Sequence, residues 1–226
     1  MATAGFASLR IDFAGAGDSA EAHLRFSLSG ATIDAQTAFN FLANHPNINK
    51  EQIVVLGFSQ GGLIAQRLVL QEPRALALAT WSTAATNGRG SFAGFFDEHY
   101  SEALSAGHAS VVFPWLSEPL GFSLQWFTEI DEQQTLTEMQ DYKAPILSIA
   151  GTADSTVPFR QSADLVSTST HPMSQLVLLA GADHIFNVLA AASSSKVEPT
   201  HSDRLLSITV SWLSELFEHH PQSARP

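Results

Sequence analysis

The run Gly57-Phe58-Ser59-Gln60-Gly61 contains residue types that could carry out nucleophilic chemistry. A serine hydroxyl is a weak nucleophile, so it needs a base to take its proton and donors to hold the oxyanion that its attack creates. Small residues on both sides allow the sharp, strained strand-to-helix turn that presents such a serine. We therefore predict Ser59 as nucleophile and the backbone N–H of Gln60 as an oxyanion donor. The alternative is a serine in an ordinary glycine-rich turn.

A base for this serine has to come from one of nine histidines. His184 closely follows an apolar run at residues 176–179, which predicts a strand ending just before it. Parallel strands present their carboxyl ends together, so this loop is expected on the same rim of the sheet as Ser59. The alternative is a structural loop histidine. His99 and His108 could instead line a pocket, but neither follows a predicted core strand.

A carboxylate is needed to orient the base. Asp154 follows the predicted strand at 145–150 and could accept the Nδ1–H of His184 and stabilise the imidazolium. Asp183 is the rival, although it adjoins His184 and side chains that are neighbours in a loop tend to diverge. The chain order Ser, Asp, His is the one expected when a Gly-x-Ser-x-Gly turn carries the nucleophile.

The elements that must position these residues alternate along the chain. Three apolar runs predict buried strands at residues 53–56, 75–81 and 145–150, a fourth apolar run predicts a last strand at 176–179, and an alternating run predicts another at 6–13. Apolar spacing predicts helices at 32–43, 61–70 and 159–167, and a terminal helix with Ser202 as N-cap and an apolar face from 205 to 216. Such alternation implies an α/β fold, with a mostly parallel sheet covered by helices on both faces.

Residues 82–142 differ from the rest of the chain in composition: they are rich in glycine, serine and aromatic side chains. The segment is too long for a simple connection between two elements of a compact domain. We predict that it is an inserted cap with short helices, and that residues 1–81 and 143–226 form the core. Its aromatic side chains would suit an apolar or aromatic acyl group, or they pack the cap onto the core.

Composition excludes several classes of function. The formal net charge is −11, from 11 basic and 22 acidic residues, and no basic run occurs, so neither nucleic acid nor an anionic membrane surface is an expected partner. The chain has no cysteine and no apolar run of the ~18 residues that a membrane span requires. No metal-ligand cluster, nucleotide loop or signal peptide is visible, so we expect no cofactor, no metal and a cytoplasmic location.

The chain resembles the α/β-hydrolase superfamily. Within it, the sequence is most similar to the small bacterial carboxylesterases that include cinnamoyl and feruloyl esterases and dienelactone-hydrolase-like relatives. The resemblance is carried by residues 6–13 with Gly15, Gly17 and Ser19, by 126–145 at the end of the cap, and by the acid and base loops at 151–158 and 181–186. Ala14 stands where the family usually has arginine. The resemblance implies a serine carboxylesterase that cleaves short-chain or aromatic-acyl esters through an acyl-enzyme. A lipase, thioesterase, peptidase or, more distantly, a cofactor-free haloperoxidase uses the same scaffold.

The sequence departs from this family at its beginning. The strand at 6–13 is normally the fourth, and the loop after the third ordinarily supplies the second N–H of the oxyanion hole. We therefore expect an N-terminally shortened fold with the cap between its sixth- and seventh-strand equivalents, and a homo-oligomer formed through the exposed sheet edge. The chain could also be a fragment of a longer one, or carry a substitute donor. The rival from another class is a truncated homologue that has no catalytic activity.

Overall fold

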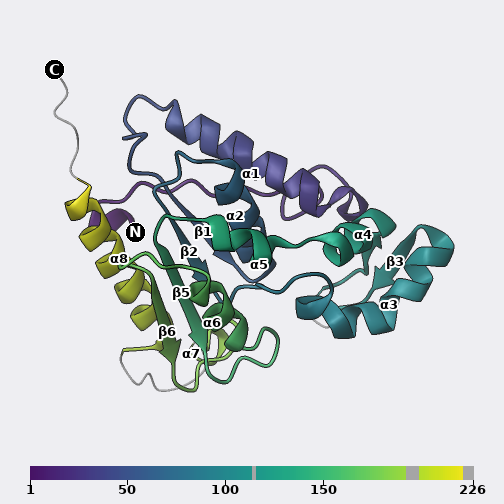
Figure 1. Ribbon diagram of the computed structural model, residues 1–226. Coiled ribbons are helices and arrows are strands. Elements are labelled where there is room, and N and C mark those ends of the chain that lie inside the picture. Colours follow the sequence, from purple (N-terminus) through teal and green to yellow (C-terminus); the bar gives the residue numbers. More distant parts are fainter. Residues whose placement is uncertain (114–115, 192–198, 221–226) are drawn as a thin grey trace.

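The computed structural model describes residues 1–113, 116–191 and 199–220 (Figure 1). Its centre is a sheet of four parallel strands, in the spatial order β1 (Val54–Phe58), β2 (Ala77–Trp81), β5 (Ile146–Gly151) and β6 (Gln175–Leu179). All four strands were predicted from apolar runs. The parallel α/β architecture is therefore the one that the sequence predicts.

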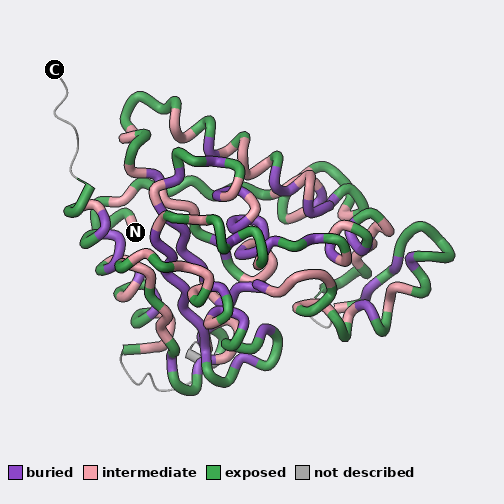
Figure 2. Tube along the Cα trace, in the orientation of Figure 1, coloured by how far each residue is buried: buried purple, intermediate pink, exposed green. Residues whose placement is uncertain are grey.

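Helices cover both faces of this sheet, because alternate residues of the central strands point to opposite sides. Leu78 and Ile146 pack with α2 (Gln60–Gln71) and α6 (Arg160–Ser167) on one face. Ala77, Leu147 and Ile149 pack with α8 (His201–His219) on the other. The central strands β2 and β5 are the buried ones, and they form the core between the two helix layers in Figure 2.

The remaining core helix is α1 (Leu28–Ala43), which begins four residues earlier than predicted and packs on α2.

The N-cap predicted for the terminal helix was wrong by two residues. Thr200, not Ser202, caps α8, because Thr200 and Asp203 form a reciprocal capping box that satisfies two free N–H groups. Shorter helical turns occur at η1 (Ala2–Ala4), η2 (His23–Arg25) and α7 (Val188–Ala191).

The first predicted strand is not formed. Residues 6–13 have no strand pairing, and β1 is the outermost strand of the sheet among the described residues. A cavity of about 400 Å³ lies along β1 and is lined by residues of both segments, among them Leu9, Ile11 and Leu56. The prediction that β1 is buried on both faces was therefore also wrong: Leu56 and Phe58 remain 39% and 40% exposed.

Residues 82–142 lie between β2 and β5 and are here called the insertion. Its elements are η3 (Gly90–Phe92), α3 (Ala93–Ala106), β3 (His108–Val111), β4 (Leu120–Ser123), α4 (Leu124–Glu132), α5 (Thr135–Glu138) and η4 (Met139–Asp141). The antiparallel pair of β3 and β4 was not foreseen. Figure 1 shows α3, β3 and α4 standing away from the sheet at one end of the molecule. In the described parts of the chain, no helix is long and apolar enough to cross a membrane.

Candidate active site

Ser59 lies on a strained turn between β1 and α2. Its φ of 54° and ψ of −126° are unusual for a residue with a side chain. The turn is held by hydrogen bonds on both sides: the Ser59 N–H donates to the Trp81 carbonyl at 3.0 Å, and the Ser59 carbonyl accepts from Ala84 at 3.1 Å. Strain of this kind persists only where the surroundings over-determine it, and it often marks a functional site.

Glycines make this turn possible because other side chains would not fit. A Cβ at Gly57 would lie 2.3 Å from the Gly61 carbonyl oxygen. A Cβ at Gly62 would lie 2.1 Å from the Thr83 hydroxyl oxygen. The close packing of β1 on the first turn of α2 therefore depends on Gly57, and the close packing of that turn on the segment after β2 depends on Gly62.

The structure brings the three predicted side chains together. The Ser59 Oγ lies 3.0 Å from His184 Nε2, and His184 Nδ1 lies 2.8 Å from Asp154 Oδ2. The second bond fixes the tautomer: Nδ1–H donates to the carboxylate, which leaves Nε2 free to accept the proton of the serine. The Asp154 side chain is fully buried and that of His184 is 18% exposed. The arrangement can therefore deprotonate Ser59 and stabilise the resulting imidazolium.

The loop after β5 fixes the Asp154 carboxylate. Its Oδ1 accepts the backbone N–H groups of Thr156 and Val157 at 2.9 and 2.8 Å, which leaves Oδ2 for the imidazole. Asp183, the alternative acid, binds within its own loop: its Oδ1 accepts hydrogen bonds from the N–H groups of Ile185 and Asn187. Asp154 is therefore the carboxylate that contacts His184 Nδ1.

The Gln60 N–H belongs to the first residue of α2. The first N–H groups of a helix have no carbonyl partner within it, and the helix dipole favours negative charge at this end. Gln60 thus carries a backbone donor at the residue that directly follows Ser59.

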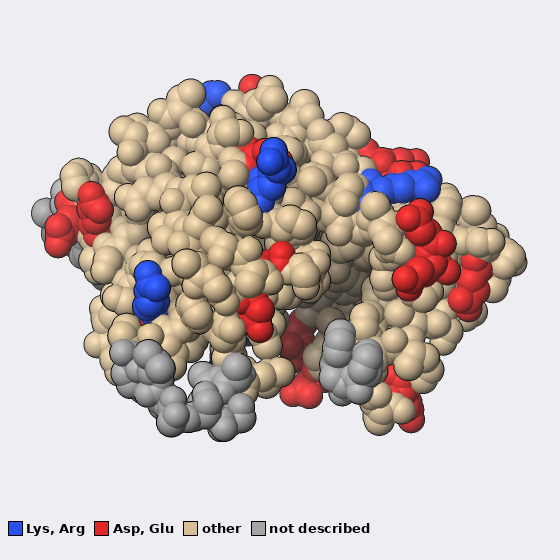
Figure 3. Space-filling model, turned by 90° about the horizontal axis from the view of Figure 1, so that it is seen from below, with Lys and Arg blue, Asp and Glu red and all other residues tan. Residues whose placement is uncertain are grey.

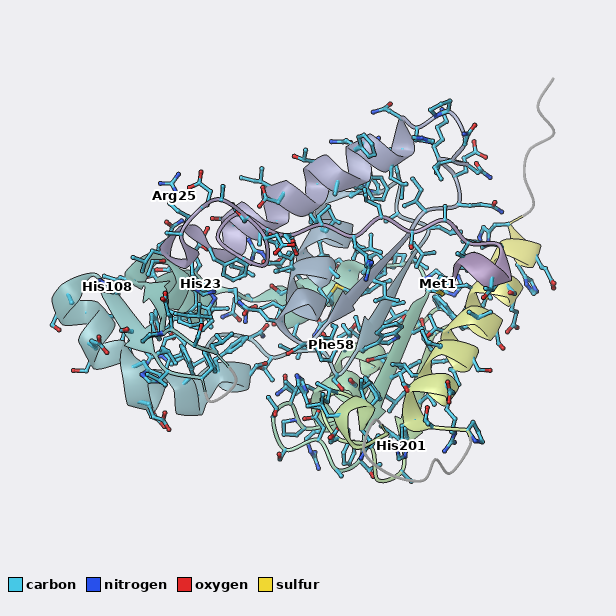
Figure 4. All side chains as sticks on the ribbon, turned by 180° about the vertical axis from the view of Figure 1, so that it is seen from behind. Met1, His23, Arg25, Phe58, His108 and His201 are labelled. Carbon is cyan, nitrogen blue, oxygen red and sulfur yellow. The ribbon has the colours of Figure 1, made fainter. Side chains whose placement is uncertain are left out.

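The two alternative histidines do not join this site. His108 is exposed, and its Nδ1 lies 3.3 Å from the Ala106 carbonyl. His99 contacts Glu98 and the ring of Phe95 within the insertion. Figure 4 shows His108 at the outer end of the insertion, well away from Phe58.

Sequence reasoning missed a contact of the base. The ring of Phe58 lies 5.0 Å from the His184 ring, at an interplanar angle of 37°. Phe58 immediately precedes Ser59, so the turn that presents the nucleophile also places an aromatic face against the imidazole. Its partial exposure gives the site an apolar surface.

Ser59, Asp154 and His184 follow the carboxyl ends of β1, β5 and β6. Figure 3 looks onto the carboxyl ends of the strands, where the surface is hollowed between the two parts of the molecule. Most aromatic side chains of the insertion pack it onto the core: Phe96, Phe122, Trp126 and Phe127 are buried in one cluster with residues of α1 and α2, among them Leu28, Leu63 and Ile64. Across the described ranges, no three histidine or acidic side chains converge in a way that could hold a metal ion.

Comparison with solved structures shows the same fold. Est1E from Butyrivibrio proteoclasticus, with ferulic acid bound, aligns with a TM-score of 0.69 and 17% identity over 92% of this chain and 74% of its own. A monoacylglycerol lipase from Paleococcus ferrophilus gives 0.67 and 17% over 91% and 82%. The α/β-hydrolase GrgF from Penicillium sp. sh18 gives 0.67 and 14% over 92% and 78%. At these identities the likeness establishes the fold.

The family comes from the sequence itself. No curated protein matches the chain significantly. The pattern of the family described as Serine aminopeptidase, S33 matches residues 1–126, which is more than half of the 226 residues. The matched part contains the strained turn at Ser59. The chain is therefore a member of the serine aminopeptidase S33 family, within the α/β-hydrolase superfamily.

Proposed function

We propose that this hydrolase is a serine carboxylesterase that cleaves short-chain or aromatic-acyl esters. The observation that carries the proposal is the continuous chain of contacts from Ser59 Oγ through His184 to Asp154, at 3.0 and 2.8 Å, on a strained strand-to-helix turn. These are the distances and the order of roles that a general base and its orienting acid require.

In the proposed reaction, Ser59 Oγ attacks the ester carbonyl carbon while His184 Nε2 takes the hydroxyl proton. The Gln60 N–H stabilises the oxyanion of the tetrahedral intermediate. The intermediate collapses, the bond to the alcohol oxygen breaks, and His184 returns the proton to the departing alcohol. Water then attacks the acyl-enzyme with His184 again as base, and the carboxylic acid leaves.

The acyl preference rests on the surroundings of the serine. Phe58 presents a partly exposed aromatic face beside His184, which suits an apolar or aromatic group better than a charged one. The likeness in fold to Est1E, solved with ferulic acid bound, is compatible with an aromatic acyl group. We propose that the insertion acts as a cap over this group.

Hydrolysis of p-nitrophenyl esters from acetate to decanoate tests the proposal, with Ser59→Ala as the matched variant. We expect turnover by the wild type, loss of turnover in Ser59→Ala, and a chain-length profile that measures the acyl pocket. A well-folded wild type that hydrolyses none of the esters contradicts the proposal and favours a homologue without catalytic activity.

The family description favours a second candidate, a peptidase that attacks an N-terminal amide bond. Aminoacyl p-nitroanilides distinguish the two, because they release a coloured amine only on amide cleavage. We expect kcat/KM for the best ester to exceed that for any anilide. The reverse order would assign the site to a peptidase.

We further propose that copies of the chain associate through β1. The strand has no hydrogen-bonded partner strand on its outer side among the described residues, and Leu56 is 39% exposed. Exposed apolar edge strands promote association. Light scattering at micromolar concentration should give a dimer or larger species, and a monomer would contradict this.

A further inference from the structure

The loop that carries His184 is closed by hydrogen bonds between its own residues. Asp183 Oδ1 accepts the N–H of Ile185 at 3.1 Å and that of Asn187 at 2.7 Å. In return, the Asp183 N–H donates to Asn187 Oδ1 at 3.0 Å. The Asp183 carbonyl accepts a further bond from Phe186 at 3.1 Å. These bonds enclose His184 within a five-residue ring.

The ring holds a backbone that would not form by itself. Phe186 and Asn187 both have a φ of 57°, in the left-handed region. Asparagine tolerates this conformation, but phenylalanine adopts it at a cost. The Phe186 side chain is only 3% exposed and packs into the core beneath α8. The bonds to Asp183 and the buried Phe186 ring together offset the strain.

The same loop is attached to the loop of the acid. The Ala153 N–H donates to the Ala182 carbonyl at 2.9 Å. A Cβ at Gly151 would lie 2.1 Å from that carbonyl oxygen, so the two loops are packed without a gap. The position of His184 relative to Asp154 is therefore set by the backbone of its loop as well as by the bond between their side chains.

We propose that Asp183, with Asn187, is a positioning residue for the base. Asp183 holds the loop so that His184 reaches Ser59 and Asp154 together. The inference rests on the proposed function, because it concerns the base of that reaction. It assigns Asp183 a role through its Oδ1 acceptor, which an asparagine also provides. The acid role of Asp154 needs a full carboxylate, since an amide there favours the wrong imidazole tautomer.

Substitution with asparagine and alanine separates these roles. We expect Asp154→Asn to lower kcat for p-nitrophenyl acetate by about 10⁴-fold. Asp183→Asn should keep kcat within about threefold of the wild type, because its Oδ1 still closes the ring. Asp183→Ala should lower kcat by about 10- to 100-fold with KM little changed, because the base is misplaced. Asp164→Ala, at an exposed aspartate on α6, is the control.

Asn187→Gly provides a second variant in case Asp183→Ala fails to fold. Glycine keeps the positive φ but removes the acceptor for the Asp183 N–H, so kcat should fall by about tenfold. The inference is overturned if Asp183→Ala has wild-type kcat and KM. It is equally overturned if Asp183→Asn loses as much activity as Asp154→Asn.

A readout that does not depend on turnover separates this inference from the proposed function. The ¹⁵N–¹H imidazole signals of His184 should show one tautomer with a slowly exchanging Nδ1 proton in the wild type and in Asp183→Asn. They should broaden or exchange rapidly in Asp183→Ala. An inactive wild type with this pattern refutes the esterase but supports the positioning role, whereas an unchanged pattern in Asp183→Ala refutes the positioning role.

Discussion

At the scale of single residues, Gly57 and Gly61 occupy equivalent positions of the Gly-x-Ser-x-Gly motif but have different surroundings. A Cβ at Gly57 would lie 2.3 Å from the Gly61 carbonyl oxygen and 2.7 Å from the Gly62 Cα, whereas one at Gly61 meets nothing within 4 Å. Backbone atoms cannot move aside as a flexible side chain can, so the two positions should respond differently to the same substitution.

We predict that Gly57→Ala lowers the free energy of unfolding by about 1–3 kcal/mol, the usual cost of overpacking. Gly61→Ala should leave it unchanged or raise it slightly, because alanine favours a helix over glycine. Urea denaturation of both variants measures this, and equal losses would mean that the turn is not packed as described.

Glu72 provides a pH-dependent contribution to stability. Its side chain is 4% exposed, and hydrogen bonds from Arg74 lower the pKa of Glu72 from 4.5 to about 2, with a further bond from Gln36. A carboxyl whose folded pKa is depressed stabilises the fold above its unfolded pKa and loses this effect as the pH falls towards its folded pKa.

Glu72→Gln should therefore cost up to about 3 kcal/mol of unfolding free energy at pH 7, and the difference from wild type should shrink as pH falls from about 4.5 towards 2. Unfolding by urea across this range measures the effect. Glu218→Gln, at an exposed glutamate of α8, is the control. A difference that stays constant down to the lowest pH would contradict the account.

The sequence predicts the three residues of the site, but not the hydrogen bonds and ring contacts that hold them in place. Ser59, Asp154 and His184 each follow a strand that apolar runs reveal, and parallel strands bring their carboxyl ends together. The ring of bonds around His184 could not be predicted, because it depends on a positive φ at Phe186 that phenylalanine does not indicate. The Phe58 contact depends equally on the turn at Ser59.

At the scale of elements, the insertion is fastened to the core at the start of α1. The Glu129 carboxylate on α4 accepts the Ser29 N–H at 2.9 Å and the Ser29 hydroxyl at 2.5 Å. Burial raises the pKa of Glu129, but hydrogen bonds from Ser29 and Gln125 outweigh burial and hold that pKa below its usual value. An anion at a helix N-terminus is also favoured by the helix dipole.

Glu129→Ala should loosen this attachment and cost about 1–3 kcal/mol, the range for a lost charged hydrogen bond. Hydrogen exchange in α4 and in the first turn of α1 should become faster, while exchange in β5 should not. Glu132→Ala, at an exposed position on the same helix, is the matched control. Equal exchange in both variants would show that Glu129 does not hold the insertion.

Helices and strands could be predicted where the spacing of apolar residues within one segment is enough to indicate them. Buried parallel strands and amphipathic helices follow from apolar spacing, and four strands were found where it placed them. Residues 6–13 show the limit of this reasoning: their alternation is typical of a strand, but a strand forms only beside a partner. A cavity separates this segment from β1, so the pattern remains unpaired.

At the scale of the whole molecule, Ser59 contacts the first residues of the insertion, because its carbonyl accepts the N–H of Ala84 at 3.1 Å. Ser59 lies at the end of the edge strand β1, and the hollow between core and insertion opens at the carboxyl ends of the strands. The family and the fold make the chain a hydrolase. The proposed serine mechanism is the central claim, and it rests on the contacts of Ser59 and Asp154 with His184.

Labelling with a fluorophosphonate, followed by peptide mass spectrometry, tests this claim most directly, because the reagent modifies a serine only when a base activates it. We predict one adduct per chain, on Ser59, that is absent in Ser59→Ala and forms at least ~100-fold more slowly in His184→Ala. A folded wild type that stays unlabelled, or is labelled at another residue, would contradict the account.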